Sequence, residues 1–154
     1  MFFYNKDGYL RPYTAIESDL ETFRQAFTWN EHRQLLYDKY LAFNEKLNAL
    51  QPGPYYQWVD GSFVSKKELP GDVDFVTFVH YERAKLLESR LVHLKKIYSS
   101  WLDASFERYY PEDHRLHDLT HIIQDDYHQL YGSTRVNTDT GIARPKGYIL
   151  IKFQ

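Results

Sequence analysis

The chain has 154 residues, 43% of them hydrophobic and 26% charged, which is the composition of a folded protein with enough sequence for one domain. It contains no cysteine, which excludes disulfides and thiolate metal sites, and its formal net charge of −2 argues against strong nonspecific binding to nucleic acid. No stretch has the length of a membrane span or the pattern of a signal peptide, so we expect a cytoplasmic protein with no membrane partner.

The first third of the sequence predicts an N-terminal arm followed by two helices. Residues 1–16 contain glycine and proline and are expected to form an irregular or extended arm. Ser18 and Glu21 have the spacing of a capping box, which indicates that a short helix starts there. A longer helix is predicted from Asn30 to Leu50, because leucine and aromatic residues recur every three or four positions after a residue suited to an N-cap.

The rest of the sequence predicts strands that alternate with helices. Strands are expected at 55–59 and 72–79, on either side of a glycine–serine turn, and an amphipathic helix at 81–98. The remaining predicted elements are a strand at 101–110, a helix at 113–131, a polar loop at 132–144 and a last strand at 147–153. This order predicts an α+β (α/β-like) fold, a small mixed sheet flanked by helices, as a single domain over residues 1–154.

Histidines gather on one side of the predicted helix 113–131. On a helical wheel they lie opposite the apolar residues, so we expect them on the face turned away from the core. Two of them also have the i, i+4 spacing of a zinc pair, which leaves a transition-metal site as the alternative to a solvated or partner-contacting face. The four residues are His114, His117, His121 and His128.

The segment from Gly61 to Phe75 is the most informative for function. A turn of Gly61 and Ser62 follows one apolar run, and Asp72 and Asp74 open the next. Side chains two apart in a strand project to the same face, roughly 6.5–7 Å apart. Carboxylates in this position can bind a hard divalent cation, and a Gly–Ser turn can bring backbone N–H groups close to a phosphate. The combination is typical of phosphoryl or nucleotidyl transfer.

This segment resembles the signature of the DNA polymerase β-like nucleotidyltransferase superfamily. The signature is an apolar residue, Gly, then Gly or Ser, and after a spacer Asp-apolar-Asp/Glu-apolar, where Val73 and Phe75 fill the apolar positions. The stretch Trp58–Phe78 is more specifically similar to a group of short prokaryotic nucleotidyltransferase-like proteins. The resemblance implies a minimal polymerase β-like nucleotidyltransferase core that binds Mg²⁺ or Mn²⁺ and an NTP, with ATP expected.

The resemblance also implies a third carboxylate, on the strand that follows the intervening helix. Asp103 lies between apolar neighbours at the start of that predicted strand and is the first candidate. Glu107 is on the same face of the strand, and Asp60 comes directly before the glycine–serine turn. We therefore predict Asp72, Asp74 and Asp103 as the catalytic and metal-binding residues.

Phosphate-binding residues are expected in and after the turn. The resemblance assigns Gly61 and Ser62 to the phosphates of the nucleotide. Lys66 and Lys67 lie between the turn and the aspartates, where an ammonium group would offset the charge of a triphosphate. Lys146, before the last predicted strand, is a further candidate.

On this resemblance, the chain is expected to move a nucleoside monophosphate from an NTP to a hydroxyl on a protein, RNA or small molecule. The implied setting is a prokaryotic toxin–antitoxin or phage-defence system. One alternative is a catalytically inactive nucleotidyltransferase-fold module that binds a partner or serves as an antitoxin. Another is an RNA-modifying enzyme, which would need a basic surface. Because the chain is short, a partner chain or a second copy is expected to help hold the base and the acceptor.

Overall fold

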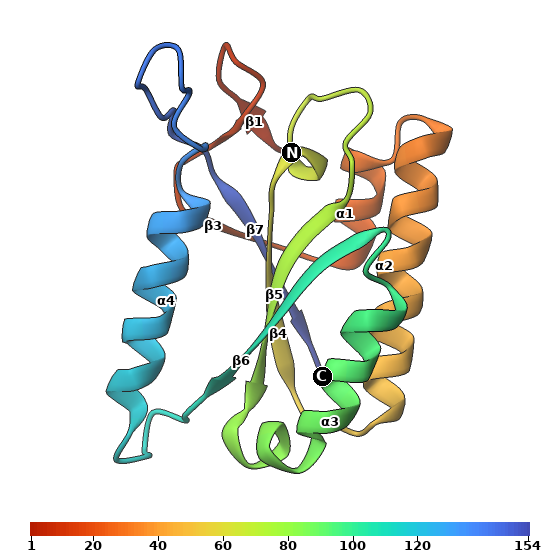
Figure 1. The fold of residues 1–154 in the computed structure, drawn as a ribbon, viewed down its shortest axis with the longest axis vertical. Helices are drawn as coiled ribbons and strands as arrows, with labels where there is room; N and C mark the ends of the chain where they lie inside the picture. Colours follow the sequence, from red (N-terminus) through yellow and green to blue (C-terminus); the bar gives the residue numbers. More distant parts are fainter.

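A five-stranded mixed sheet lies at the centre of the molecule, which is described over residues 1–154 by a computed structural model (Figure 1). The two middle strands, β4 and β5, are antiparallel to each other, and β4 is also antiparallel to β7. The outer strands β3 and β6 run parallel to their neighbours β7 and β5. In sheet order the strands are β3 (Ala15–Ser18), β7 (Tyr148–Phe153), β4 (Tyr55–Asp60), β5 (Val73–His80) and β6 (Leu102–Tyr109).

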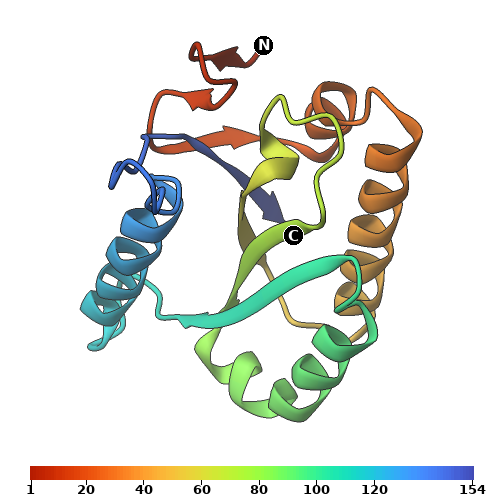
Figure 2. The same cartoon turned by 45° about the horizontal axis from the view of Figure 1, so that its top comes forward.

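Four α-helices cover the sheet on both faces and give a mixed α+β fold (Figures 1 and 2). One face is covered by α1 (Leu20–Phe27), α2 (Glu31–Ala49) and α3 (Tyr81–Ile97), and the other by α4 (His117–Tyr131). A separate two-stranded ribbon pairs β1 (Phe3–Tyr4) with β2 (Leu10–Arg11). None of the helices combines the length and the apolar character that crossing a bilayer requires.

Helices on both faces explain why β5 is apolar along most of its length. A strand buried on both sides needs apolar residues at successive positions rather than at alternate ones. Val73 and Phe75 therefore belong to the larger core beneath α2 and α3. Val76 and Phe78 belong to a second cluster with Tyr131 of α4. The charged exception is Asp74, which faces the α4 side at the end of the strand where β5 begins.

The N-terminal third differs from the prediction in two respects. Asp19, and not Ser18, caps α1, because its carboxylate accepts a hydrogen bond from the backbone N–H of Thr22 at 2.8 Å. The arm also contains a strand, β3, that pairs with β7 from the far end of the chain. Asn30 caps α2 as predicted, accepting a hydrogen bond from the N–H of Arg33 at 2.8 Å.

The predicted orientation of the histidines holds only in part, because His121 and His128 are exposed but His117 and His128 have partners beside the core. The last predicted helix begins at His117 and not at residue 113, and it buries Thr120 and Tyr131 against the sheet. His117 and His128 lie beside this buried face, where their Nδ1 atoms are 2.7 Å from the Tyr110 carbonyl and 2.6 Å from the Tyr148 hydroxyl. Imidazole can satisfy such polar partners at the edge of an aromatic cluster, whereas leucine cannot. The exposed residues of the helix also include Leu119 and Leu130, which the prediction placed on the core side.

Candidate active site

Three aspartates lie side by side on neighbouring strands. Asp60 is opposite Asp74 in the antiparallel pair of β4 and β5, and Asp74 is opposite Asp103 in the parallel pair of β5 and β6. Residues in register on adjacent strands project from the same face of the sheet, so the three carboxylates form a row. Asp72, two residues before Asp74, extends the acidic group at the same end of β5.

Asp60 differs from the other aspartates because its charge is neutralised. The Nζ atom of Lys146 lies 2.6 Å from both carboxylate oxygens of Asp60, and both side chains are buried. Because it is already paired with Lys146, Asp60 is not available as an alternative third carboxylate. Lys146, a predicted phosphate ligand, uses its ammonium group for this ion pair.

Among these aspartates, Asp74 has the least favourable environment for a negative charge. Burial, together with the neighbouring charges of Asp103, Asp60 and Asp72, raises its pKa to about 7. The hydroxyl of Tyr131 lies 3.5 Å from Oδ1 of Asp74 and is the nearest donor at the end of α4. Asp74 is thus a carboxyl group that would bind either a proton or a cation near neutral pH.

The pKa of Asp72 is raised as well. Burial and the charge of Asp103 increase it, whereas Arg135 and Lys67 act in the opposite direction. Arg135 belongs to the loop after α4, which the sequence analysis treats only as a polar connection. Its position near Asp72 shows that this loop forms part of the wall around the carboxylates.

The glycine–serine turn packs directly against Asp74. Gly61 has a φ of 79°, and a Cβ atom at this position would lie 3.2 Å from the Cβ of Asp74. Both the left-handed conformation and the close approach favour glycine. A 3₁₀ turn, Ser62–Val64, follows. In it the N–H groups of Val64 and Ser65 donate hydrogen bonds to the carbonyls of Gly61 and Ser62, respectively. Its first N–H groups have no partner within the turn and are free to bind an anion.

A single buried arginine holds this segment in place. Arg33 of α2 is fully buried and its guanidinium has no carboxylate partner; instead it donates to backbone carbonyls. Burial lowers its pKa to about 10, so it remains charged at neutral pH. The guanidinium of Arg33 lies over the ring of Trp29, with Cζ 3.7 Å from the ring centroid. The acceptors are the carbonyls of Phe27, Ser62, Phe63, Ser65 and Lys67.

This arrangement also determines which way the peptide groups of the turn point. The C=O and the following N–H of a trans peptide point in opposite directions. Carbonyls directed at Arg33 therefore turn the N–H groups of the segment away from α2. Arg33 is not among the residues predicted from the sequence, although the sequence contains a signal for it. Arg33 lies at helical spacing from Leu36, Tyr37 and Tyr40, so it occupies an apolar-face position that an arginine takes only with a specific set of partners.

A cleft of about 1330 Å³ opens above the row of aspartates, between the turn, α4 and the loop after α4. Every site residue predicted from the sequence lines it: Gly61, Ser62, Lys66, Lys67, Asp72, Asp74 and Asp103. Glu107 does not; its carboxylate accepts a hydrogen bond from Tyr127 at 3.1 Å. The Nζ atom of Lys66 lies 4.3 Å from the centroid of the Tyr4 ring, which holds this lysine at the rim.

The carboxylates form a row and not a cage. No group of three or more histidine, aspartate or glutamate side chains is arranged to hold a metal ion. The same is true of the histidines, where His117 and His121 are neighbours, with ring centroids 4.7 Å apart, but have no third ligand. Any cation at the aspartates would need further ligands from outside the protein.

Comparison with known proteins places the chain in a family. Residues 2–152 match the model of DUF6932, a family of unknown function, and the chain belongs to that family. No curated protein and no solved structure matches it. The family description assigns no activity, so the function has to be argued from the geometry of the cleft.

Replacing Arg33 by lysine is expected to lower the free energy of unfolding by about 2–4 kcal/mol, because a single ammonium group leaves several buried carbonyls without a donor. Urea unfolding followed by circular dichroism measures the change. Arg24→Lys is the matched control: Arg24 pairs with Glu21 on the exposed side of α1, and its replacement should leave the free energy of unfolding nearly unchanged. Equal stability of the two variants would contradict the role of Arg33.

Replacing Asp74 by asparagine is expected to stabilise the metal-free protein at high pH. The raised pKa means that the folded protein holds this proton more tightly than the unfolded chain, so stability falls as pH rises from 3.8 to about 7. Allowing for partial exposure, Asp74→Asn should gain about 1–2 kcal/mol at pH 8, or about 2–8 °C in Tm, and little at pH 4. Thermal unfolding in EDTA at both pH values tests this, with Asp125→Asn as the surface control. A gain that is equal at both pH values would show that the charge is not its cause.

Proposed function

We propose that the protein is a metal-dependent nucleotidyltransferase. It moves a nucleoside monophosphate from an NTP, with ATP as the expected donor, to a hydroxyl on a protein, RNA or small molecule. The observation that carries the proposal is the register of Asp74 with Asp103, directly beside the turn of Gly61 and Ser62. The order of α2, β4, the turn, β5, α3, β6 and α4 supports assigning the fold to the minimal polymerase β-like core.

The donor set suits Mg²⁺ or Mn²⁺. Asp72, Asp74 and Asp103 offer only oxygen ligands, and none of them forms an ion pair. Mg²⁺ is commonly held by one or two carboxylates together with substrate phosphates and water. A row of carboxylates without a closed cage is therefore compatible with a cation that enters with the nucleotide. When bound, such a cation would offset the negative charge that gathers on the phosphates and the aspartates.

The residues around the aspartates have separate roles in this proposal. The free N–H groups at the start of the 3₁₀ turn donate hydrogen bonds to the nucleotide phosphates, and Gly61 lets them approach closely. Lys67 and Arg135, which already lower the pKa of Asp72, add positive charge to the wall of the cleft. Arg33 acts through the turn and touches no substrate.

The chemical step replaces the anhydride oxygen on the α-phosphorus by the oxygen of the acceptor, which forms an ester. The oxygen of the acceptor hydroxyl attacks, and a new O–P bond forms. The bond between the α-phosphorus and the oxygen that bridges to the β-phosphate breaks, so that pyrophosphate leaves with the electron pair. The proton of the hydroxyl moves to a carboxylate. Asp103 is the candidate base, because it is exposed to the cleft and lies next to Asp74.

Nucleotide binding is expected to depend on the cation. Calorimetry with ATP, GTP, CTP and UTP, each with and without Mg²⁺, should show binding of at least one nucleotide only when the metal is present. Asp74→Asn should weaken that binding by at least about tenfold, because a carboxylate next to the metal is lost, whereas Asp125→Asn should not. If no nucleotide binds in a metal-dependent way, the protein is an inactive module with this fold.

Asp103→Asn is expected to reduce turnover far more than nucleotide affinity. A hydroxyl loses its proton only in the transition state, and loss of a general base lowers kcat by about 10²–10⁴-fold. Transfer of labelled α-phosphate from ATP to protein or RNA in a lysate, with an ATP titration of the same variant, separates the two effects. Glu107→Gln is the control, since Glu107 lies outside the cleft. Full activity in Asp103→Asn together with loss in Glu107→Gln would assign the base to Glu107.

A further inference from the structure

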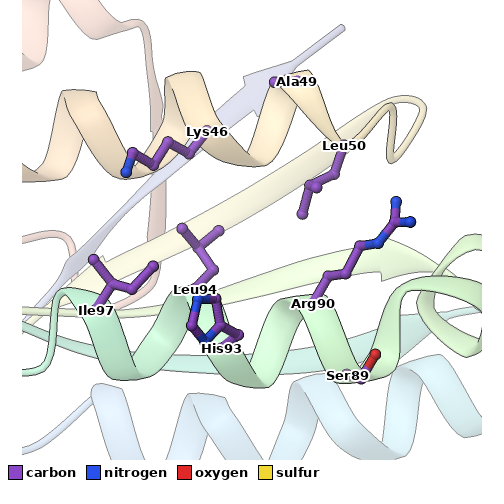
Figure 3. Close-up of a pocket in the computed structure, with 8 residues that line it drawn as sticks. All are labelled: Lys46, Ala49, Leu50, Ser89, Arg90, His93, Leu94 and Ile97. Carbon is purple, nitrogen blue, oxygen red and sulfur yellow. The ribbon is translucent and has the colours of Figure 1, made fainter.

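A second concave surface lies between α2 and α3, on the helical layer that covers the face of the sheet opposite α4 (Figures 1 and 3). This groove has a volume of about 410 Å³, and its exposed area is mainly apolar. Leu50 points into it from α2, and Leu94 and Ile97 do so from α3 (Figure 3). Its complete lining is Lys46, Ala49, Leu50, Ser89, Arg90, His93, Leu94 and Ile97.

Basic side chains surround the apolar floor of this groove without acidic partners. Lys46, Arg90 and His93 take part in none of the ion pairs of the protein. The whole of α3 carries five lysine or arginine residues and two glutamates. Leu86, 71% exposed, continues the line of Arg90, His93 and Ile97 toward the start of the helix. The surface therefore combines apolar contact area with unpaired positive charge.

The outer face of α4 has the opposite character. Leu119, Ile122 and Leu130 are 41%, 55% and 65% exposed, and they follow one line along the helix. The helix contains no lysine or arginine, and its three acidic residues are exposed: Asp118 and Asp125 beside the apolar line, and Asp126 within it between Ile122 and Leu130. Three large apolar side chains on one exposed helix face, accompanied only by acidic charge, are typical of a helix that docks on another protein surface.

We propose that the outer face of α4 docks into the α2–α3 groove of a second copy of this chain. The apolar line of the helix would cover Leu50, Leu94 and Ile97, and its aspartates would meet Lys46 and Arg90. This occupant is chosen because the two surfaces of one sequence complement each other in both apolar character and charge. The proposal concerns assembly and does not depend on the enzymatic activity proposed above.

The positions of the two surfaces determine the kind of assembly. The groove and α4 lie on opposite faces of the sheet, so two copies cannot satisfy both contacts across one twofold axis (Figure 1). The contact is therefore heterologous and continues from copy to copy. Asp126 and Leu130 also line the acidic cleft, so a docked copy places its basic α2–α3 surface at the rim of its neighbour's cleft.

Sedimentation velocity over a range of protein concentrations tests the proposal. The wild type is expected to grow beyond a dimer as concentration rises, and less so at high salt, because the charges that meet are exposed. Lys46→Glu with Arg90→Glu reverses the charge of the groove, and Asp125→Lys with Asp126→Lys reverses that of the helix. Each double variant should weaken self-association by at least about tenfold. A chain that carries both reversals should associate again, because its two surfaces are complementary once more.

A control with the same change of charge makes the test specific. Lys85→Glu with Lys95→Glu alters α3 outside the groove and should leave association unchanged. All substituted side chains are exposed, and circular dichroism checks that each variant folds. A wild type that stays monomeric at every concentration would overturn the proposal. So would a closed dimer, or a failure of the combined reversal to restore association.

Discussion

The buried guanidinium of Arg33 is the interaction on which the shape of the acidic cleft depends. The turn after β4 must run close to Asp74, which leaves a series of carbonyl groups facing the interior. Buried carbonyls require donors, and Arg33 supplies them from a helix that is itself fixed by the core. Because the carbonyls point to α2, the N–H groups of the turn are directed elsewhere. One side chain thus links the packing of α2 to the orientation of the peptide groups in the turn.

The acidic residues of the cleft show how a site can be built at a cost in stability. Asp60 has a buried lysine partner, whereas Asp74 and Asp103 are placed side by side without one. Core packing alone would favour neutral side chains at such positions, and the raised pKa of Asp74 reflects the unfavourable environment. Uncompensated charge of this kind is common at functional sites. Asp60 thus belongs to a structural ion pair, whereas Asp74 has no such partner and is available for chemistry.

The two faces of the sheet give the molecule two different surfaces. On one side, α2 and α3 complete the larger core and present basic residues outward. On the other, α4 covers only part of the sheet and leaves the end with the aspartates open. The same helix contributes Tyr131 to the site and its acidic outer face to the surface. Activity and assembly, both proposals, would therefore meet at the C-terminal end of α4.

The sequence by itself determined the local features of this protein. The alternation of side chains along a strand places Asp72 and Asp74 together, and helical periodicity locates most of α2 and α3. Only the tertiary structure decided what each face meets. The partner of Asp60 lies 86 residues away, β3 pairs with the last strand, and two histidines of α4, His117 and His128, have partners in Tyr110 and Tyr148. Periodicity depends on neighbours in the chain, whereas these contacts depend on how distant segments pack, so no local pattern could specify them.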